Sequence, residues 1–128
     1  MNQVASYILK AKNAFIPAII CAVIILVLSA LPQSSFHAID WYDIVNLDKF
    51  GHLVVYAIFT VLIAIGLFLR NNKKYILKAV FMAVGYGALM ELLQYGCFTG
   101  RNFEILDLIA NIIGSIIGSV ICYFIIKK

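Results

Sequence analysis

Four long apolar runs, separated by short polar segments, constrain the fold of this chain more than any other feature. They cover residues 14–31, 47–69, 75–95 and 106–126. An α-helix rises about 1.5 Å per residue, so about 20 apolar residues are needed to cross a hydrocarbon core of about 30 Å. Each run is close to this length. We therefore expect an all-α, multi-pass membrane protein built as a bundle of four transmembrane helices.

The composition agrees with membrane insertion. Hydrophobic residues make up 64% of the 128 residues and charged residues 12%, and the mean hydropathy is +1.02, which is far from the values of soluble proteins. The net charge of +4 does not indicate nucleic-acid binding, because the basic residues lie between apolar runs and not along one exposed face. The length predicts a single domain over residues 1–128.

We expect neither a disulfide framework nor a cleaved signal peptide. Cys21, Cys97 and Cys122 form an odd set without C-x-x-C spacing. The run at 14–31 is long for a signal peptide, and Leu28 departs from the small residues that precede a cleavage site. The first run is therefore expected to remain as a spanning helix.

The basic residues indicate how the chain is oriented. Four spans place eight of the ten basic residues on one side of the membrane, namely Lys10, Lys12, Arg70, Lys73, Lys74, Lys78, Lys127 and Lys128. The positive-inside rule makes that side cytoplasmic. We therefore expect both termini in the cytoplasm, a tight hairpin at residues 70–74, and all six acidic residues on the outer side or in the outer halves of helices.

Residues 32–46 are expected to form a polar and aromatic loop between the first two spans. Pro32 ends the first helix, and Trp41 and Tyr42 suit the membrane interface. His37 has no neighbour with metal-ligand spacing, so it is interpreted as a solvated loop residue. Asp48 then stands at the expected start of the second helix, where a carboxylate can cap backbone N–H groups.

The last three spans carry their polar residues on stripes. On the second span, Asp48, His52 and Tyr56 recur every four residues and share one helix face. The stripe of the third span consists of Gly87, Glu91 and Gln94, and that of the fourth of Asp107, Asn111, Gly114 and Gly118. Lipid cannot satisfy polar groups, so the stripes should face one another or line a pocket open to the outside. Counting along each helix places His52, Glu91 and Asn111 at one depth.

The glycines on these stripes are expected to serve helix packing. Gly114 and Gly118 form a small-xxx-small pair, which lets a neighbouring helix come close. Gly87 is assigned a similar part on the third span. This glycine pair is informative because it shares a helix face with Asp107 and Asn111.

Several of these residues together resemble one known family. The chain carries DKFGH at 48–52 with Tyr56, the pair Glu91 and Gln94, GRNFEILD at 100–107, and Asn111 three residues before Gly114. These motifs, within residues 47–118, are similar to those of the VanZ-like family, small bacterial membrane proteins whose namesake is linked to teicoplanin resistance. The resemblance implies a multi-pass protein of the bacterial cytoplasmic membrane, with a polar site at its outer face.

Two functions fit this polar site about equally. In the first, the site binds a lipid headgroup, a lipid-linked wall precursor or an amphiphilic lipoglycopeptide antibiotic, with Lys49 and Arg101 suited to a phosphate or carboxylate. In the second, the charges form a structural ion-pair network in a membrane scaffold or assembly protein. The residues expected in either case are Asp48, Lys49, His52, Tyr56, Glu91, Gln94, Arg101, Asp107 and Asn111. An oligomer is compatible with both.

A third hypothesis is an enzyme of the outer leaflet, with His52 and Glu91 as an acid and base pair. No serine or cysteine nucleophile has a base at a suitable spacing, so catalysis is not favoured. A metal site built from His52 with Glu91 and Asp107 is conceivable, but one histidine without a ligand motif gives little support. No metal and no cofactor are therefore expected.

Overall fold

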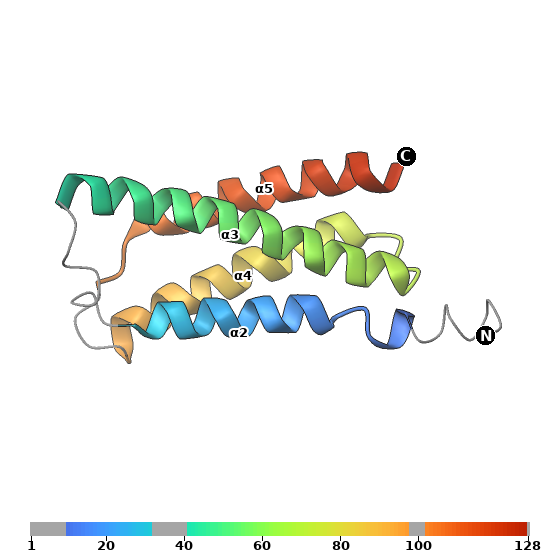
Figure 1. Cartoon of the computed structure of the whole chain (residues 1–128), viewed down its shortest axis with the longest axis horizontal. Helices are drawn as coiled ribbons and strands as arrows, with labels where there is room; N and C mark the ends of the chain where they lie inside the picture. The colour runs from blue at the N-terminus through green and yellow to red at the C-terminus, as the bar shows by residue number, and fades with distance from the viewer. Residues whose placement is uncertain (1–9, 32–40, 98–101, 128) are drawn as a thin grey trace.

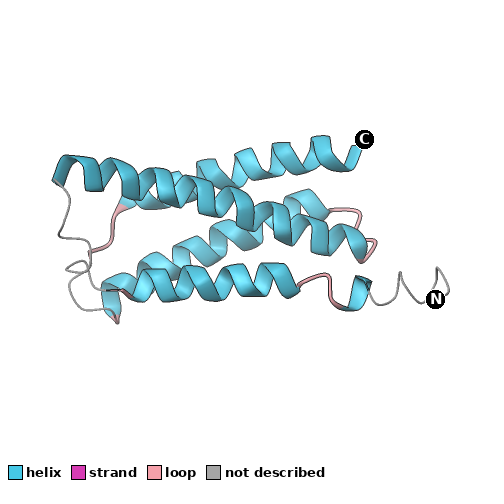
Figure 2. Ribbon diagram, viewed as in Figure 1, coloured by secondary structure: helices cyan, strands magenta, loops and turns pink. Residues whose placement is uncertain are grey.

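A computed structural model describes residues 10–31, 41–97 and 102–127, with the backbone alone at 41–46. The helices are α2 (Ile16–Ala30), α3 (Trp41–Leu69), α4 (Tyr75–Gly96) and α5 (Ile105–Lys127), and a helical turn from Lys10 precedes α2. Figure 1 shows these helices side by side along one axis, and Figure 2 shows that turns and loops join them. The described part of the chain contains no strand.

All four helices are long and apolar enough to cross a membrane, as predicted. Their candidate spans are Lys10–Ala30, Leu47–Leu69, Tyr75–Gly96 and Ile105–Lys127. Large apolar side chains cover the outside of the bundle, and Phe81, for example, is 71% exposed. Such a surface is stable against lipid tails and not against water.

Successive helices run in opposite directions, with α3 in contact with each of the other three. At one end of the bundle, on the left in Figure 1, α3 and α5 begin and α2 and α4 end. We call this the polar end, because Asp48, Glu91, Glu104 and Asp107 lie near it along their helices. Apart from Lys49, the described basic residues lie towards the opposite end of the bundle, which we call the basic end.

Helix α3 begins six residues earlier than predicted. The expected loop to residue 46 was wrong, because Trp41 already starts the helix. Residues 41–50 contain neither proline nor glycine, and a helix that extends beyond the hydrocarbon core needs no apolar side chains there. Seven helical residues precede Asp48, so the capping interpretation of this residue was also wrong.

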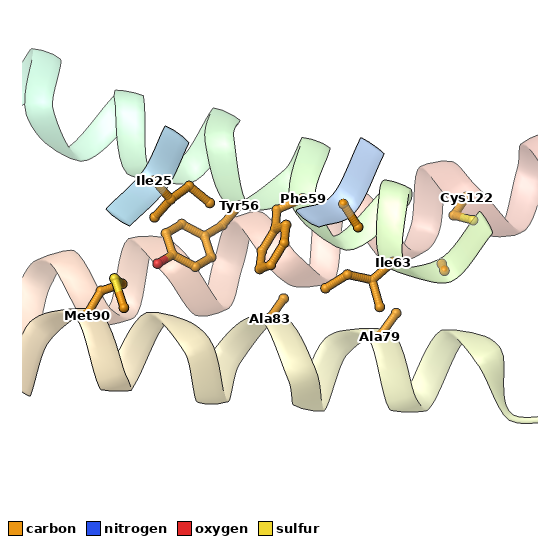
Figure 3. Close-up of a cluster of buried hydrophobic side chains, with 10 residues drawn as sticks. Ile25, Tyr56, Phe59, Ile63, Ala79, Ala83, Met90 and Cys122 are labelled. Atoms are coloured by element: carbon orange, nitrogen blue, oxygen red, sulfur yellow. The ribbon is translucent and has the colours of Figure 1, made fainter. Parts of the chain in front are cut away.

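The apolar core fills the middle of the bundle. Figure 3 shows α3 directing Phe59 and Ile63 towards Ala83 and Ala79 of α4, and the ring of Tyr56 towards Met90. Both alanines are fully buried, and their small side chains leave room for the aromatic rings. The core is completed by Ile25 from α2, Met90 from α4 and Cys122 from α5.

The basic end is closed by the tight hairpin predicted at residues 70–74. Asn71 adopts a positive φ of 58°, a conformation that asparagine tolerates better than most residues. The guanidinium of Arg70 lies 5.1 Å from the centre of the Phe15 ring, and its Nε donates to the carbonyl of Ala11 at 3.3 Å. These contacts join the start of α2 to the end of α3.

Two glycines set the contact between α5 and α3. A Cβ atom added at Gly114 would collide with the carbonyl oxygen of Leu53, and one added at Gly118 would collide with that of Ala57. The backbones therefore touch directly along this line, which we call the glycine seam. Close approach of this kind is typical of small-xxx-small pairs in membrane helices.

Candidate functional site

The candidate site is built where α3, α4 and α5 converge. A Cβ atom added at Gly87 of α4 would lie 3.0 Å from Nδ2 of Asn111 on α5 and 3.1 Å from Cε1 of Tyr56 on α3. Tyr56 and Asn111 are both fully buried or nearly so. The missing side chain of Gly87 thus lets a phenol and a carboxamide meet between the three helices.

One helical turn nearer the polar end, each of these helices carries an ionisable residue. His52 precedes Tyr56 by four residues, Asp107 precedes Asn111 by four, and Glu91 follows Gly87 by four on the antiparallel helix. Glu91 is 1% exposed and Asp107 is 4% exposed. The three stripes predicted from the sequence therefore face inward and bring two carboxyl groups and an imidazole into one layer.

His52 is the centre of the contacts in this layer. Its Nδ1 lies 2.9 Å from Oδ1 of Asn111, and its Nε2 lies 3.8 Å from Oδ1 of Asp48 and 4.0 Å from Oδ2 of Asp107. The ring also lies parallel to that of Tyr56, with centroids 6.4 Å apart. The imidazole is therefore fixed on one edge by an amide and faces two carboxylates with the other.

Lys49 lies at the rim of the same cluster. Its Nζ donates to Oε2 of Glu104 at 3.2 Å and lies 3.7 Å from Oδ1 of Asp107. The Lys49 side chain is 22% exposed, whereas that of Asp107 is 6% exposed. Since Asp107 is buried, its attraction to the ammonium is screened less than that of Glu104, which is 47% exposed.

This layer and the turn below it, with Tyr56 and Asn111, contain buried polar atoms without a hydrogen-bond partner. Among the described residues these atoms are Oη of Tyr56, Oε1 and Oε2 of Glu91, Oδ1 of Asp107 and Nδ2 of Asn111. Buried polar groups in native proteins are nearly always hydrogen-bonded, and an unsatisfied one costs about 1–3 kcal/mol. All of them belong to residues of the three converging stripes.

One residue expected in the site, Gln94, contacts another helix. The amide of Gln94 donates to the backbone carbonyl of Ser29 at 3.3 Å, so its side chain is directed to α2 and not to His52. In the same way, the hydroxyl of Tyr86 donates to the carbonyl of Ala22 at 2.7 Å. These two bonds join α4 to α2. Arg101 lies outside the described residues.

Sequence reasoning also missed a neighbour of the site, because Glu104 pairs with Lys49 at the rim, outside the buried cluster. Glu104 directly precedes α5, and its carbonyl accepts from the backbone N–H groups of Asp107 and Leu108. Its position three residues before Asp107 was a usable signal, since residues three apart at a helix start lie on one side. Ser29, the partner of Gln94, carried no such signal because it lies in an apolar run.

Asp48, His52 and Asp107 are also arranged as metal ligands could be. One donor atom from each can be chosen so that all three lie within 4.8 Å of one another. For the acid and base pair that the sequence suggested, the described residues show no hydrogen bond between His52 and Glu91. The histidine instead contacts Asp48, Asp107 and Asn111.

Four membrane-length helices with ionisable side chains buried at one end define a multi-pass integral membrane protein. The family model described as VanZ/LLP1 matches residues 15–127, nearly the whole chain including α2, and the protein belongs to this family. No match was found among curated proteins or among solved structures.

Proposed function

We propose that this VanZ-family protein binds the polar headgroup of a membrane amphiphile at the polar end of its bundle. The observation that carries the proposal is the set of buried atoms on Tyr56, Glu91, Asp107 and Asn111 that have no hydrogen bond, of which Oδ1 of Asp107 has only its ion pair with Lys49. A bound headgroup would give these atoms the hydrogen bonds that the protein itself does not supply. The net gain per bond to a charged group is about 1.5–3 kcal/mol, enough for selective binding.

The orientation of the bundle would place this end at the outer leaflet of the bacterial cytoplasmic membrane. Lys10, Lys12, Lys73 and Lys74 lie towards the opposite end with Lys127, and basic residues favour the cytoplasmic side. The rim is accessible, since the side chain of Asp48 is 43% exposed. A headgroup would enter past this rim while its acyl chains remain in the membrane.

The atoms of the site indicate which headgroups it suits. Glu91 and Asp107 offer only acceptors when ionised, and Lys49 is already paired with Glu104 and Asp107. A headgroup that carries hydroxyl or amino donors matches these acceptors better than a bare phosphate does. Glycolipids, lipid-linked wall precursors and lipoglycopeptide antibiotics share this chemistry.

Native mass spectrometry of the full chain tests the proposal. The protein, purified in detergent, is offered phosphatidylglycerol, a diacylglycerol glycolipid and a lipid-linked wall precursor in separate samples. We expect a one-to-one adduct with a sugar-bearing amphiphile that weakens about tenfold in Glu91→Gln, because one acceptor oxygen is replaced by an NH2 donor. Glu104→Gln is the matched control and should bind as the wild type does. Equal binding by the Glu91→Gln and wild-type proteins would overturn the proposal.

A structural role is the second candidate, and the two contacts of Lys49 favour it. If the cluster only holds the helices together, Glu91→Gln should lower the amount of folded protein in the membrane. In that case the wild-type protein should show no amphiphile adduct in the spectra. The same spectra bear on catalysis, because an outer-leaflet enzyme using His52 would change the mass of the amphiphile offered. Unchanged masses with a persistent adduct would favour binding.

A further inference from the structure

We infer that Asp48, His52 and Asp107 form a site for one divalent metal ion of the zinc class. One donor atom from each residue lies within 4.8 Å of the other two. Ligands at about 2.0–2.2 Å around a tetrahedral ion are about 3.3–3.6 Å apart, so pairs of donor atoms would have to approach each other by at most about 1.5 Å to close the site. This inference goes beyond headgroup binding and does not depend on it.

The hydrogen bond to Asn111 prepares His52 for this role. The carboxamide oxygen at Oδ1 only accepts, so the Nδ1 that lies 2.9 Å away carries the hydrogen. In a neutral imidazole Nε2 then has a free lone pair. Metal-bound histidines in proteins nearly always donate their other N–H to such an oxygen, which fixes the ring and its tautomer.

The free edge of His52 points towards negative charge. Nε2 lies 3.8 Å from Oδ1 of Asp48 and 4.0 Å from Oδ2 of Asp107. An unprotonated Nε2 that faces two carboxylates is unfavourable unless a proton or a metal ion lies between them, and distances of 3.8 and 4.0 Å are longer than direct hydrogen bonds. A divalent ion would satisfy all three groups at once.

Buried unpartnered oxygens at the same place form an independent observation. Asp107 is 4% exposed, and its Oδ1 has no hydrogen bond although Lys49 lies 3.7 Å away. Glu91, in the same layer, is 1% exposed with both oxygens unpartnered. The ammonium of Lys49 pairs with Glu104 and Asp107, so among the described residues Asp48 and Glu91 are left without a lysine or arginine partner. A second cation would balance the cluster.

The donor set determines the class of ion. One imidazole nitrogen and two carboxylate oxygens suit Zn²⁺, whereas Ca²⁺ takes six to eight oxygens and Mg²⁺ a near-octahedral set of oxygens. Three protein ligands leave a fourth position on the ion open. The partial exposure of the Asp48 side chain, 43%, gives this position access to the polar end.

Zinc binding to the purified full chain tests the site directly. The protein is prepared without a histidine tag and with Cys97→Ser, because the exposed Cys97 thiol would otherwise bind zinc. Equilibrium dialysis against Zn²⁺ should give one ion per chain, with Mg²⁺ in excess failing to displace it. In Asp48→Asn the affinity should fall at least about tenfold, as expected for a lost ligand.

Matched variants distinguish zinc binding at this site from an unspecific attraction of zinc to negative charge. Glu104→Gln removes a carboxylate of the same rim outside the three ligands, and it should bind zinc within about twofold of the parent protein. Asp48 is partly exposed, so Asp48→Asn is expected to fold. Circular dichroism and size-exclusion chromatography verify that it does. Asp48 is chosen over the buried Asp107 because loss of a buried ligand could prevent folding. Absence of saturable binding in the parent protein, or equal losses in Asp48→Asn and Glu104→Gln, would overturn the inference.

Discussion

His52 on α3 and Asn111 on α5 are joined by a hydrogen bond of 2.9 Å between Nδ1 and Oδ1, across 59 positions of sequence. The bond lies inside the bundle, where Asn111 is fully buried. It holds two helices at one depth and sets the direction of the imidazole. Its removal should therefore affect both the stability of the bundle and the geometry of the polar cluster.

Replacing Asn111 by leucine tests the first of these effects. Asn111→Leu keeps the side-chain shape but leaves Nδ1 of His52 without a partner, and we expect the free energy of unfolding to fall by about 1–3 kcal/mol. Unfolding is followed by circular dichroism during SDS titration of the protein in detergent micelles. Ser119→Ala, whose hydroxyl donates to the carbonyl of Ile116 in its own helix, should change the free energy of unfolding by less than about 0.5 kcal/mol. Similar effects of both variants would contradict the prediction.

The glycine seam predicts opposite outcomes for two glycine-to-alanine changes. Gly114→Ala places a methyl group against the carbonyl oxygen of Leu53, so α3 and α5 must separate, at a cost of about 1–3 kcal/mol or more. A Cβ atom at Gly85 meets nothing within 4 Å, and Gly85→Ala should stabilise its helix by up to about 1 kcal/mol. Thermal unfolding of the two proteins in the same detergent gives the comparison. Equal midpoints would show that the backbones do not touch at Gly114.

Lys49 should contribute more to stability than its exposed partner Glu104 does. Lys49→Gln removes the cation near the buried carboxyl of Asp107, and we expect a loss of about 2 kcal/mol or more, towards the 3–5 kcal/mol of a broken buried pair. Glu104→Gln removes a half-exposed group and should cost less than about 1 kcal/mol. SDS titration at low and high salt measures both losses. A larger loss in Glu104→Gln would place the main partner of Lys49 at the rim.

Cys97 reports the orientation of the bundle. This cysteine is exposed at the polar end, whereas Cys21 is half-buried and Cys122 fully buried in the spans. If the basic end is cytoplasmic, a membrane-impermeant thiol reagent should label intact cells through Cys97 alone, and the Cys97→Ser protein should remain unlabelled. Labelling that appears only after the membrane is permeabilised would reverse the topology.

The sequence predicts the helices well because a hydrocarbon core imposes length and polarity on them. The run at 47–69 coincides with the candidate span Leu47–Leu69, since both reflect the same apolar residues. The start of α3 at Trp41 was missed because residues 41–46 are not part of the apolar run. Once a helix leaves the hydrocarbon core, hydropathy no longer distinguishes it from a loop.

The contacts of single side chains were harder to predict than the stripes that carry them. Spacing along a helix determines which residues share a face, and Gly87, Glu91 and Gln94 are indeed all buried. It does not determine which neighbouring helix each side chain meets, so the bond of Gln94 to Ser29 on α2 was not foreseen. Glu104 was missed in a similar way, because its partner Lys49 lies 55 positions away.

The glycine seam also limits how the bundle can move. Where the backbones of α3 and α5 already touch at Leu53 and Ala57, there is no side chain whose rotation could widen the space between them. The two helices that carry His52 and Asp107 should therefore move as one rigid body. Any opening of the polar end has to come from α4 and α2. These two helices are joined by the hydrogen bonds of Tyr86 and Gln94, so they would move away from α3 and α5 together.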